Sequence, residues 1–196
     1  WGVPQSPTHH PEVDTGVHLL MVLDQCAKIQ APLPVRWACL MHDLGKGSTP
    51  SSLWPRHIGH EQRSAKLAQQ IADRLKVSTE CRALADVVAR EHGHIHQSDD
   101  LGAEATLRLL ERCDALRRPD RFAQVLQACE CDARGRLGLQ DRAYAPAHRL
   151  AHALQQVLSV DTEPVVSQAQ AQGLDGPALG QAVRQARILA LEAPSV

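Results

Sequence analysis

Apolar residues recur along this chain at every third or fourth position, which is the spacing of one face of an α-helix. Asp14 is placed to cap a first helix that runs to about Gln30. Pro34 is placed to begin a second helix, which Gly45 ends. No segment alternates in the manner of a β-strand. The same spacing predicts six further helices, over residues 60–75, 79–92, 103–116, 119–133, 146–158 and 177–192.

The segments between these helices are rich in proline and glycine. Residues 1–13 hold three prolines and follow neither period, so we expect a linker from an N-terminal part that this sequence lacks. The chain begins at Trp1, as a fragment or a processed product would. Residues 47–59 are expected to form a loop. The pattern predicts one helical domain over 14–160 and a C-terminal helical extension over 161–196.

Composition supports an all-α fold, because alanine, leucine and glutamine are common while aromatic residues make up only 3% of the 196 residues. The net charge of −1 excludes bulk attraction to nucleic acid or to an anionic membrane. The longest apolar run, Leu19 to Leu23, is far shorter than the ~20 residues of a membrane span. Six cysteines without a C-x-x-C pair favour buried, reduced thiols in a cytoplasmic protein.

Several polar side chains fall where the helical spacing places core residues. The stripe of Cys81, Leu84 and Val88 continues to His92, and the stripe of Leu107 and Leu110 continues to Asp114. A lone histidine on such a face is more often a hydrogen-bonded core residue than a metal ligand. The alternative for Asp114 is an ion pair with Arg117 or Arg118 nearby.

The combination of these residues favours a metal site. His18 lies on the first helix, and His42 is followed directly by Asp43 at the end of the second. With His92 and Asp114, four helices send imidazole or carboxylate groups inward. A metal ion offsets the cost of burying several such groups at one point.

These residues follow the order of the HD-domain metal-dependent phosphohydrolases, and the sequence resembles that superfamily. The motifs HDLGKG, TPSSLWPRHIGHE, CDALRRPDRF and CDARGRLG narrow the resemblance to the C-terminal HD domain of bacterial CCA-adding tRNA nucleotidyltransferases. It extends from Gly2 to Tyr144 and weakens in the last fifty residues. No glycine-rich turn with paired aspartates, as in a nucleotidyltransferase head, is present, so we do not expect this chain alone to add CCA.

The resemblance implies an HD-domain helical bundle with the metal site between its helices. The implied ligands are His18, His42, Asp43 and Asp114, and the implied ligands of a second ion are His60 and His92. Gly93 departs from the acidic residue expected beside His92 in close relatives. Asp132 is the rival of Asp114, but it lies at the rim of its helix's apolar stripe, so we rank it second.

The resemblance also implies phosphatase, 2′-nucleotidase and 2′,3′-cyclic phosphodiesterase activity on nucleotides or RNA ends. Two imidazoles and two carboxylates with open positions suit Ni, Mn, Co, Fe or Mg better than a closed zinc site. Asp43 is the expected proton acceptor, and Lys46 is the expected phosphate clamp. Arg56 and His57 are candidates to bind substrate, although a solvated loop explains them equally well.

A second class of function is also compatible with the sequence: a tRNA-binding or structural support module of the full enzyme, without catalysis. Arg117, Arg118, Arg134 and Arg136 would then contact phosphates. A salt-bridged helical surface explains the same arginines. The expected partners are nucleotide phosphoesters and, in the full enzyme, tRNA, with no membrane; the chain would be a monomer or a homodimer.

Overall fold

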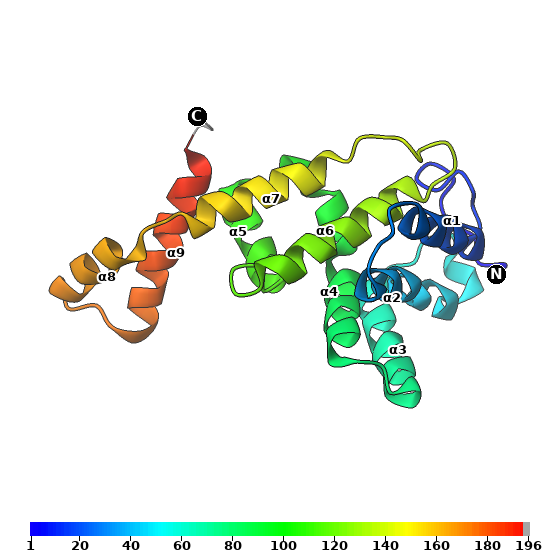
Figure 1. Ribbon diagram of the computed structural model, residues 1–196, viewed down its shortest axis with the longest axis horizontal. Coiled ribbons are helices and arrows are strands. Elements are labelled where there is room, and N and C mark those ends of the chain that lie inside the picture. Colours follow the sequence, from blue (N-terminus) through cyan, green and yellow to red (C-terminus); the bar gives the residue numbers. More distant parts are fainter. Residues whose placement is uncertain (194–196) are drawn as a thin grey trace.

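The computed structural model describes residues 1–193, whose regular secondary structure is helical (Figure 1). The only β-type pairing among them is an isolated bridge between Pro4 and Asp14, so the all-α prediction is confirmed. The α-helices are α1 (Thr15–Lys28), α2 (Leu33–Met41), α3 (His60–Leu75), α4 (Thr79–His96), α5 (Ala103–Arg112), α6 (Pro119–Arg134), α7 (Ala145–Leu158), α8 (Thr162–Ala171) and α9 (Gly176–Glu192). Short 3₁₀ helices η1 (Leu44–Ser48), η2 (Ser51–Leu53) and η3 (Ser98–Asp100) join them.

The helices form an elongated molecule with the N-terminus at one end and α8 and α9 at the other (Figure 1). Helices α2 and α4 pack against each other, and each also contacts α3 and α6. Helix α1 covers α2 and α6. Further along, α5 and α7 pack on α9, which continues the bundle away from the first four helices.

The core consists of the apolar faces that the sequence predicts. On α4, Cys81, Leu84 and Val88 are buried, and His92 continues this face with an exposed fraction of only 5%. Fully burying a leucine side chain contributes about 1.5–3 kcal/mol, so this face holds α4 against its neighbours. The orientation of His92 is therefore fixed by the packing of the whole helix.

Helix α5 ends earlier than the predicted residue 116, and the way it ends removes Asp114 from the buried face. The N–H of Asp114 donates to the carbonyl of Glu111 and that of Ala115 to Leu110, both at 2.9 Å, which is the paired bonding of a Schellman motif. Asp114 takes the left-handed conformation (φ 54°) that such an end requires and that aspartate tolerates better than most residues. The expectation that Asp114 continues the buried stripe is wrong.

One further segment differs from expectation. Residues 162–171 form α8, which the spacing did not predict, because this helix buries only Ala169. Residues 1–13 lie against the helical domain, and their role as a linker from an N-terminal part stays a prediction. The Nε2 of His57 bonds to the carbonyl of Pro4 (2.9 Å), and Gln5 is buried. The predicted division at residue 160 stays a prediction, and residues 194–196 of the predicted extension lie outside the described part.

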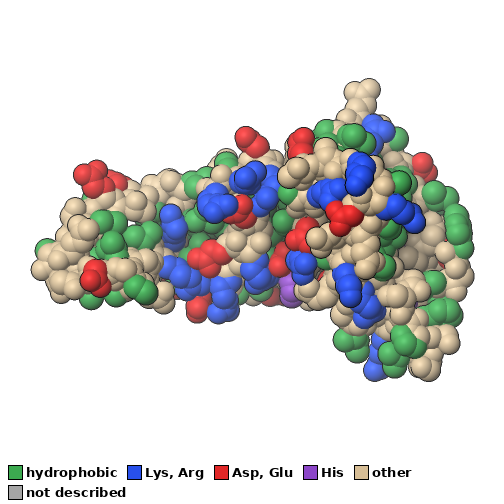
Figure 2. Space-filling view, turned by 90° about the horizontal axis from the view of Figure 1, so that it is seen from below, with side chains coloured by type: hydrophobic (Ala, Val, Ile, Leu, Met, Phe, Trp, Pro, Cys, Tyr) green, Lys and Arg blue, Asp and Glu red, His purple; other side chains and the backbone are tan. Residues whose placement is uncertain are grey.

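The surface shows no dominant charge. Lys and Arg side chains are interspersed with Asp and Glu over the middle of the face in Figure 2, in keeping with the net charge of −1. Within residues 1–193, none of the helices combines the length and the apolar character that crossing a membrane needs.

Candidate metal centre

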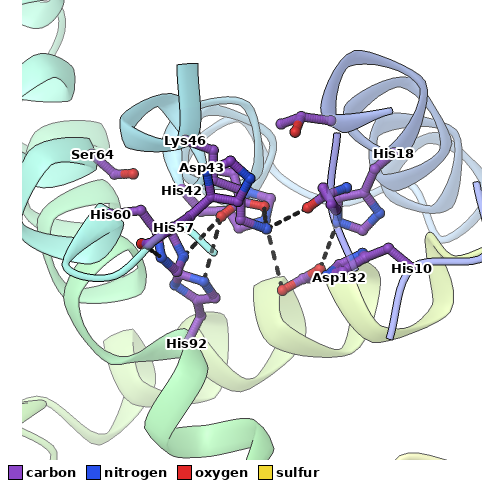
Figure 3. Close-up of polar contacts among 12 residues, drawn as sticks. His10, His18, His42, Asp43, Lys46, His57, His60, Ser64, His92 and Asp132 are labelled. Atoms are coloured by element: carbon purple, nitrogen blue, oxygen red, sulfur yellow. Dashed lines mark hydrogen bonds and ion pairs between the residues drawn. The ribbon is translucent and has the colours of Figure 1, made fainter. Parts of the chain in front are cut away.

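Histidine and aspartate side chains from five helices converge on one point at the end of the bundle nearest the N-terminus (Figure 3). Each comes from a helix or from the residues that directly follow one, so the packing of the bundle fixes its position. The members are His18 on α1, His42 and Asp43 after α2, His60 at the start of α3, His92 on α4 and Asp132 in the last turn of α6.

The motif HDLGKG brings two of these helices together. Gly45 in η1 passes so close to α3 that a Cβ on it would lie 2.2 Å from the carbonyl oxygen of His60. The N–H of Gly45 also donates to the hydroxyl of Ser64 (2.8 Å). Glycine is therefore required by close packing at this position, and this contact places Asp43 and Lys46 beside the start of α3.

Three imidazoles of the cluster share one hydrogen-bonding arrangement. The Nδ1 atoms of His42, His60 and His92 bond to the carbonyl oxygens of Cys39 (2.7 Å), His57 (2.9 Å) and Val88 (3.0 Å), respectively, which fixes Nδ1 as the protonated nitrogen. Nε2 is then left free to accept or ligate and faces the cluster. Such outward bonds to Nδ1 are the usual support of metal-binding histidines.

His18 is oriented by a buried carboxylate from the N-terminal segment. Its Nδ1 lies 3.0 Å from Oε1 of Glu12, whose side chain is only 1% exposed, and 3.2 Å from the carbonyl of Gly135. Its Nε2 lies 2.9 Å from Oδ1 of Asp132. Burial alone raises the pKa of Glu12, but the hydrogen bond from His18, the backbone N–H bonds of Glu12 and Leu137 and the charge of His18 together outweigh it and lower the pKa to about 2.

Asp132 is the carboxylate that contacts the histidines of α1 and of the end of α4. Besides the contact with His18, its Oδ2 lies 2.7 Å from Nε2 of His96 and 3.6 Å from Nε2 of His42. His96 is held from its other side by the hydroxyl of Tyr144 (2.8 Å). Burial alone raises the pKa of Asp132, but the neighbouring imidazoles of His42 and His96 outweigh it and hold this pKa well below its usual range.

Asp43 is the second carboxylate of the cluster, and it contacts Lys46 and three histidines. Its Oδ2 lies 2.7 Å from Nζ of Lys46 and 3.3 Å from Nε2 of His42, while its Oδ1 faces Nε2 of His60 (3.3 Å) and of His92 (3.7 Å). Although burial opposes both charged forms, the attraction between Asp43 and His42 lowers the pKa of the aspartate and raises that of the histidine. His92 differs, since burial and then the charge of His42 lower its pKa to about 3, so it is a neutral donor.

The cluster fits a divalent cation. Among the described residues, Nε2 of His42, Oδ1 of Asp43 and Nε2 of His60 are buried without a hydrogen-bond partner. Buried polar atoms are rarely left unpaired, and the two imidazole nitrogens lie on either side of the Asp43 carboxylate. Imidazole nitrogens and carboxylate oxygens are donors that bind divalent metal ions, and ions bound on the two sides of Asp43 would satisfy these atoms.

A cleft of about 510 Å³ opens above the cluster, which is the size of a small-molecule site. Its floor includes Asp43, Asp132 and Lys46, and the N-terminal segment forms one wall through Gln5 and His10. The cleft thus connects the cluster with solvent.

One sequence-predicted ligand, Asp114, lies away from the cluster. Asp114 lies outside the cluster, 30% exposed, and its carboxylate pairs with Arg117 (2.9 Å) and Arg121 (3.0 Å). Arg121 precedes Asp132 on α6 by about three turns, about 16 Å along the helix axis. The carboxylate that the structure brings to His18 and His42 is therefore that of Asp132, which we had ranked second.

The two loop residues predicted to bind substrate, Arg56 and His57, differ in their position relative to the cleft. Arg56 is exposed and is not among the residues that line the cleft, so its role in substrate binding stays a prediction. His57 lines the cleft, but both its ring nitrogens are used: Nδ1 bonds to the hydroxyl of Thr49 (3.0 Å) and Nε2 to the carbonyl of Pro4. Its contacts make it an anchor for the N-terminal segment.

Sequence reasoning missed three residues of the site. His96 and Glu12 touch the cluster, and Arg136, considered only as an RNA contact, lines the cleft. A spacing of four from His92 to His96 along one helix face was the available indication for His96. Nothing in the local pattern pointed to Glu12, because it lies in a segment without periodicity.

A scan against family models matches residues 15–127, more than half of the chain, to the model described as "HD domain". Curated relatives carry the name "Multifunctional CCA protein". Those of Verminephrobacter eiseniae (strain EF01-2) and Acidovorax sp. (strain JS42) are each 61% identical over 191 residues, which is 97% of this chain and 46% and 45% of the relatives. That of Paracidovorax citrulli (strain AAC00-1) is 62% identical over 187 residues, 95% of this chain and 45% of the relative. The chain spans about half the length of these relatives, and no solved structure matches it.

Proposed function

This chain belongs to the HD domain family, and we propose that it is a divalent-metal-dependent phosphohydrolase that acts on nucleotide phosphoesters or RNA ends. The observation that carries the proposal is the set of buried, unpartnered Nε2 and carboxylate atoms at the floor of a cleft. We propose His18, His42, Asp43 and Asp132 as the ligands of a tightly held ion. His60 and His92, which face the second oxygen of Asp43, are the proposed additional ligands of a weaker second ion.

The proposed ion is Ni, Mn, Co, Fe or Mg, and when bound it supplies Lewis-acid charge that activates water and neutralises negative charge on the phosphate. Asp43 has two oxygens that face different partners. One oxygen is free to ligate while the other accepts the proton of the attacking water.

Lys46 is the proposed phosphate clamp. An ammonium has three N–H donors, and here two of them go to Asp43 and to Oε1 of Gln5. The third is free to donate to a phosphate oxygen in the cleft, which Lys46 lines. Because these two hydrogen bonds hold its ammonium group in place, Lys46 is positioned before the substrate binds.

Within a longer protein like the curated relatives, we propose that the chain is the HD part and that tRNA is a partner of the whole. The alternative of a support module without catalysis predicts no hydrolysis at all. The test is hydrolysis of bis-p-nitrophenyl phosphate, 2′,3′-cyclic AMP and 2′-AMP by chelator-stripped protein with each metal added back. We expect metal-dependent turnover that His42→Ala and Asp43→Asn abolish.

The matched control is His148→Ala, which removes an exposed histidine of α7. Circular dichroism establishes that each variant is folded. Turnover that is independent of metal, or that survives in Asp43→Asn, would reject the hydrolase. Absence of turnover with all five metals, together with tRNA binding, would favour the support module.

A further inference from the structure

A second hollow adjoins the cleft, and the proposed hydrolysis does not use it. It encloses about 220 Å³ and shares His96 and Arg136 with the cleft. On its far side it is lined by Arg134, Arg142 and Tyr144. The two spaces therefore meet at His96 and Arg136, and a ligand that reaches the metal cluster can extend past these residues into the second hollow.

The second hollow carries positive charge that the rest of the chain leaves unneutralised. Within residues 1–193, neither Arg136 nor Arg142 forms an ion pair, and Nε of Arg136 is buried without a hydrogen-bond partner. Arg134 donates to Glu130 (2.8 Å) and to the carbonyl of Arg142 (3.1 Å). A salt-bridged helical surface thus explains Arg134, but not the other two guanidinium groups.

The one acidic residue that lines the hollow does not cancel this charge. Asp99 is 59% exposed and lies 3.7 Å from Arg149, so it already has a cation beside it. The arginines near the start of α6 are a contrast, because Arg117 and Arg118 both pair with Asp114. Of the four arginines considered as RNA contacts, only Arg134 and Arg136 lie beside the cleft.

The backbone that carries Arg136 is held firmly. Gly135 packs on α1 so closely that a Cβ would lie 2.5 Å from Cγ2 and 2.7 Å from Cα of Val22. The N–H of Leu137 donates to Oε2 of Glu12 (3.2 Å), the same carboxylate that holds His18. Arg136 is therefore fixed relative to the metal cluster by contacts on both sides.

From these observations we propose that the second hollow is a subsite for a second phosphate group, so that the favoured ligand is an oligonucleotide end. The inference rests on the proposed function of the neighbouring cleft. A guanidinium group binds phosphate oxygens through a planar fork of N–H donors, and unpaired arginines along a groove are suited to following a phosphodiester backbone. The phosphate bound there is the one on the 5′-oxygen of the terminal nucleotide, which in an oligonucleotide joins that nucleotide to its neighbour.

The test is equilibrium binding to Mn²⁺-loaded protein by titration calorimetry. Three ligands are compared: adenosine 3′-phosphate, adenosine 3′,5′-bisphosphate and the dinucleotide ApAp, each with a slowly hydrolysed terminal phosphorothioate. We expect the second and third to bind about tenfold more tightly than the first, as one charge-assisted contact provides. In Arg142→Gln, most of this affinity ratio between the ligands with two phosphates and the ligand with one should be lost. Arg74→Gln, which replaces an exposed arginine on α3, should keep the ratio.

Equal binding of all three ligands by the wild type would overturn the subsite, as would a ratio that Arg142→Gln leaves intact. A gain for ApAp alone would assign the hollow to a nucleoside and also reject a phosphate subsite. Because binding and turnover are measured separately, a preserved ratio without hydrolysis contradicts only the hydrolase. Hydrolysis without a ratio contradicts only the subsite.

Discussion

The assignment of Asp132 rather than Asp114 to the metal centre leads to a prediction with a built-in control. Asp132→Asn removes one negative charge from the cluster and keeps the shape of the side chain. Asp114→Gly removes a carboxylate at a helix end that accommodates glycine, since φ there is 54°. Asp132→Asn should lose affinity for metal, whereas Asp114→Gly should keep it.

The magnitude follows from the contacts of each carboxylate. Loss of a residue that merely supports a ligand reduces metal affinity 10–100-fold, so loss of the ligand charge itself should cost about 100-fold or more, about 2.8 kcal/mol. Asp132 also accepts bonds from the buried imidazole of His18 and the partly buried imidazole of His96, and losing such a partner destabilises the metal-free protein by about 3 kcal/mol. Asp114 makes only surface ion pairs. Their loss is offset because glycine adopts the left-handed conformation with less strain than aspartate. The net change in the free energy of unfolding should therefore stay within about 1 kcal/mol.

The assay is calorimetric titration of chelator-stripped wild type and both variants with Mn²⁺, with urea unfolding of the metal-free proteins alongside. Equal affinity in wild type and Asp132→Asn would refute the assignment. So would a greater loss in Asp114→Gly than in Asp132→Asn.

The pH dependence of unfolding gives the same prediction a second measurement. The pKa of Asp132 in the folded state is held well below the unfolded value of about 3.9. Its contribution to the free energy of unfolding is therefore present above that value and is lost as pH falls through the folded pKa. The stability difference between metal-free wild type and Asp132→Asn should shrink below about pH 4; a difference that grows there would contradict the sign.

Other predictions concern the second ion, the positioning of the ligands, the packing and the thiols. His92→Ala should lose a weak second ion and keep the first, whereas His94→Ala, exposed on the same helix, should keep both; loss of the tight ion in His92→Ala would contradict this. Glu12→Gln should weaken Mn²⁺ binding 10–100-fold in calorimetry, since it holds a ligand histidine, and unchanged affinity would exclude that role. Gly135→Ala should lower the free energy of unfolding by about 1–3 kcal/mol because its Cβ would meet Val22; unaltered urea unfolding would argue against this contact. All six cysteines are buried, so Ellman's reagent should label thiols only after unfolding, and rapid labelling of the native protein would show otherwise.

The parts of the site that sequence predicts are those set by local helical spacing. His92 continues an apolar face that begins about three turns earlier at Cys81, and His42 with Asp43 follows a helix directly, so their inward direction follows from periodicity. Asp114 obeyed the same spacing and was misplaced, because the helix ends two residues before it. Apolar spacing predicts which residues share a helix face only while the helix continues. It does not predict where the helix ends when the left-handed residue of the Schellman motif is not a glycine.

The remaining parts depend on contacts between distant segments. Residues 1–13 have no periodicity, yet they are held by His57 at Pro4, by Lys46 at Gln5 and by His18 at Glu12. These partners lie tens of residues apart or on another element, so no local pattern contains them. Helix α8 was missed for the related reason that it buries a single residue and therefore has almost no apolar stripe.

The central claim is that the histidine–aspartate cluster holds a catalytic divalent ion. The most direct measurement titrates chelator-stripped protein with Mn²⁺ and records, at each point, both the bound ion and the rate of 2′,3′-cyclic AMP hydrolysis. The account predicts that the rate rises in proportion to the first ion bound per chain and that Asp43→Asn shows neither tight binding nor turnover. Full activity in the stripped protein, or tight binding of one ion at the cluster without any turnover, would contradict it.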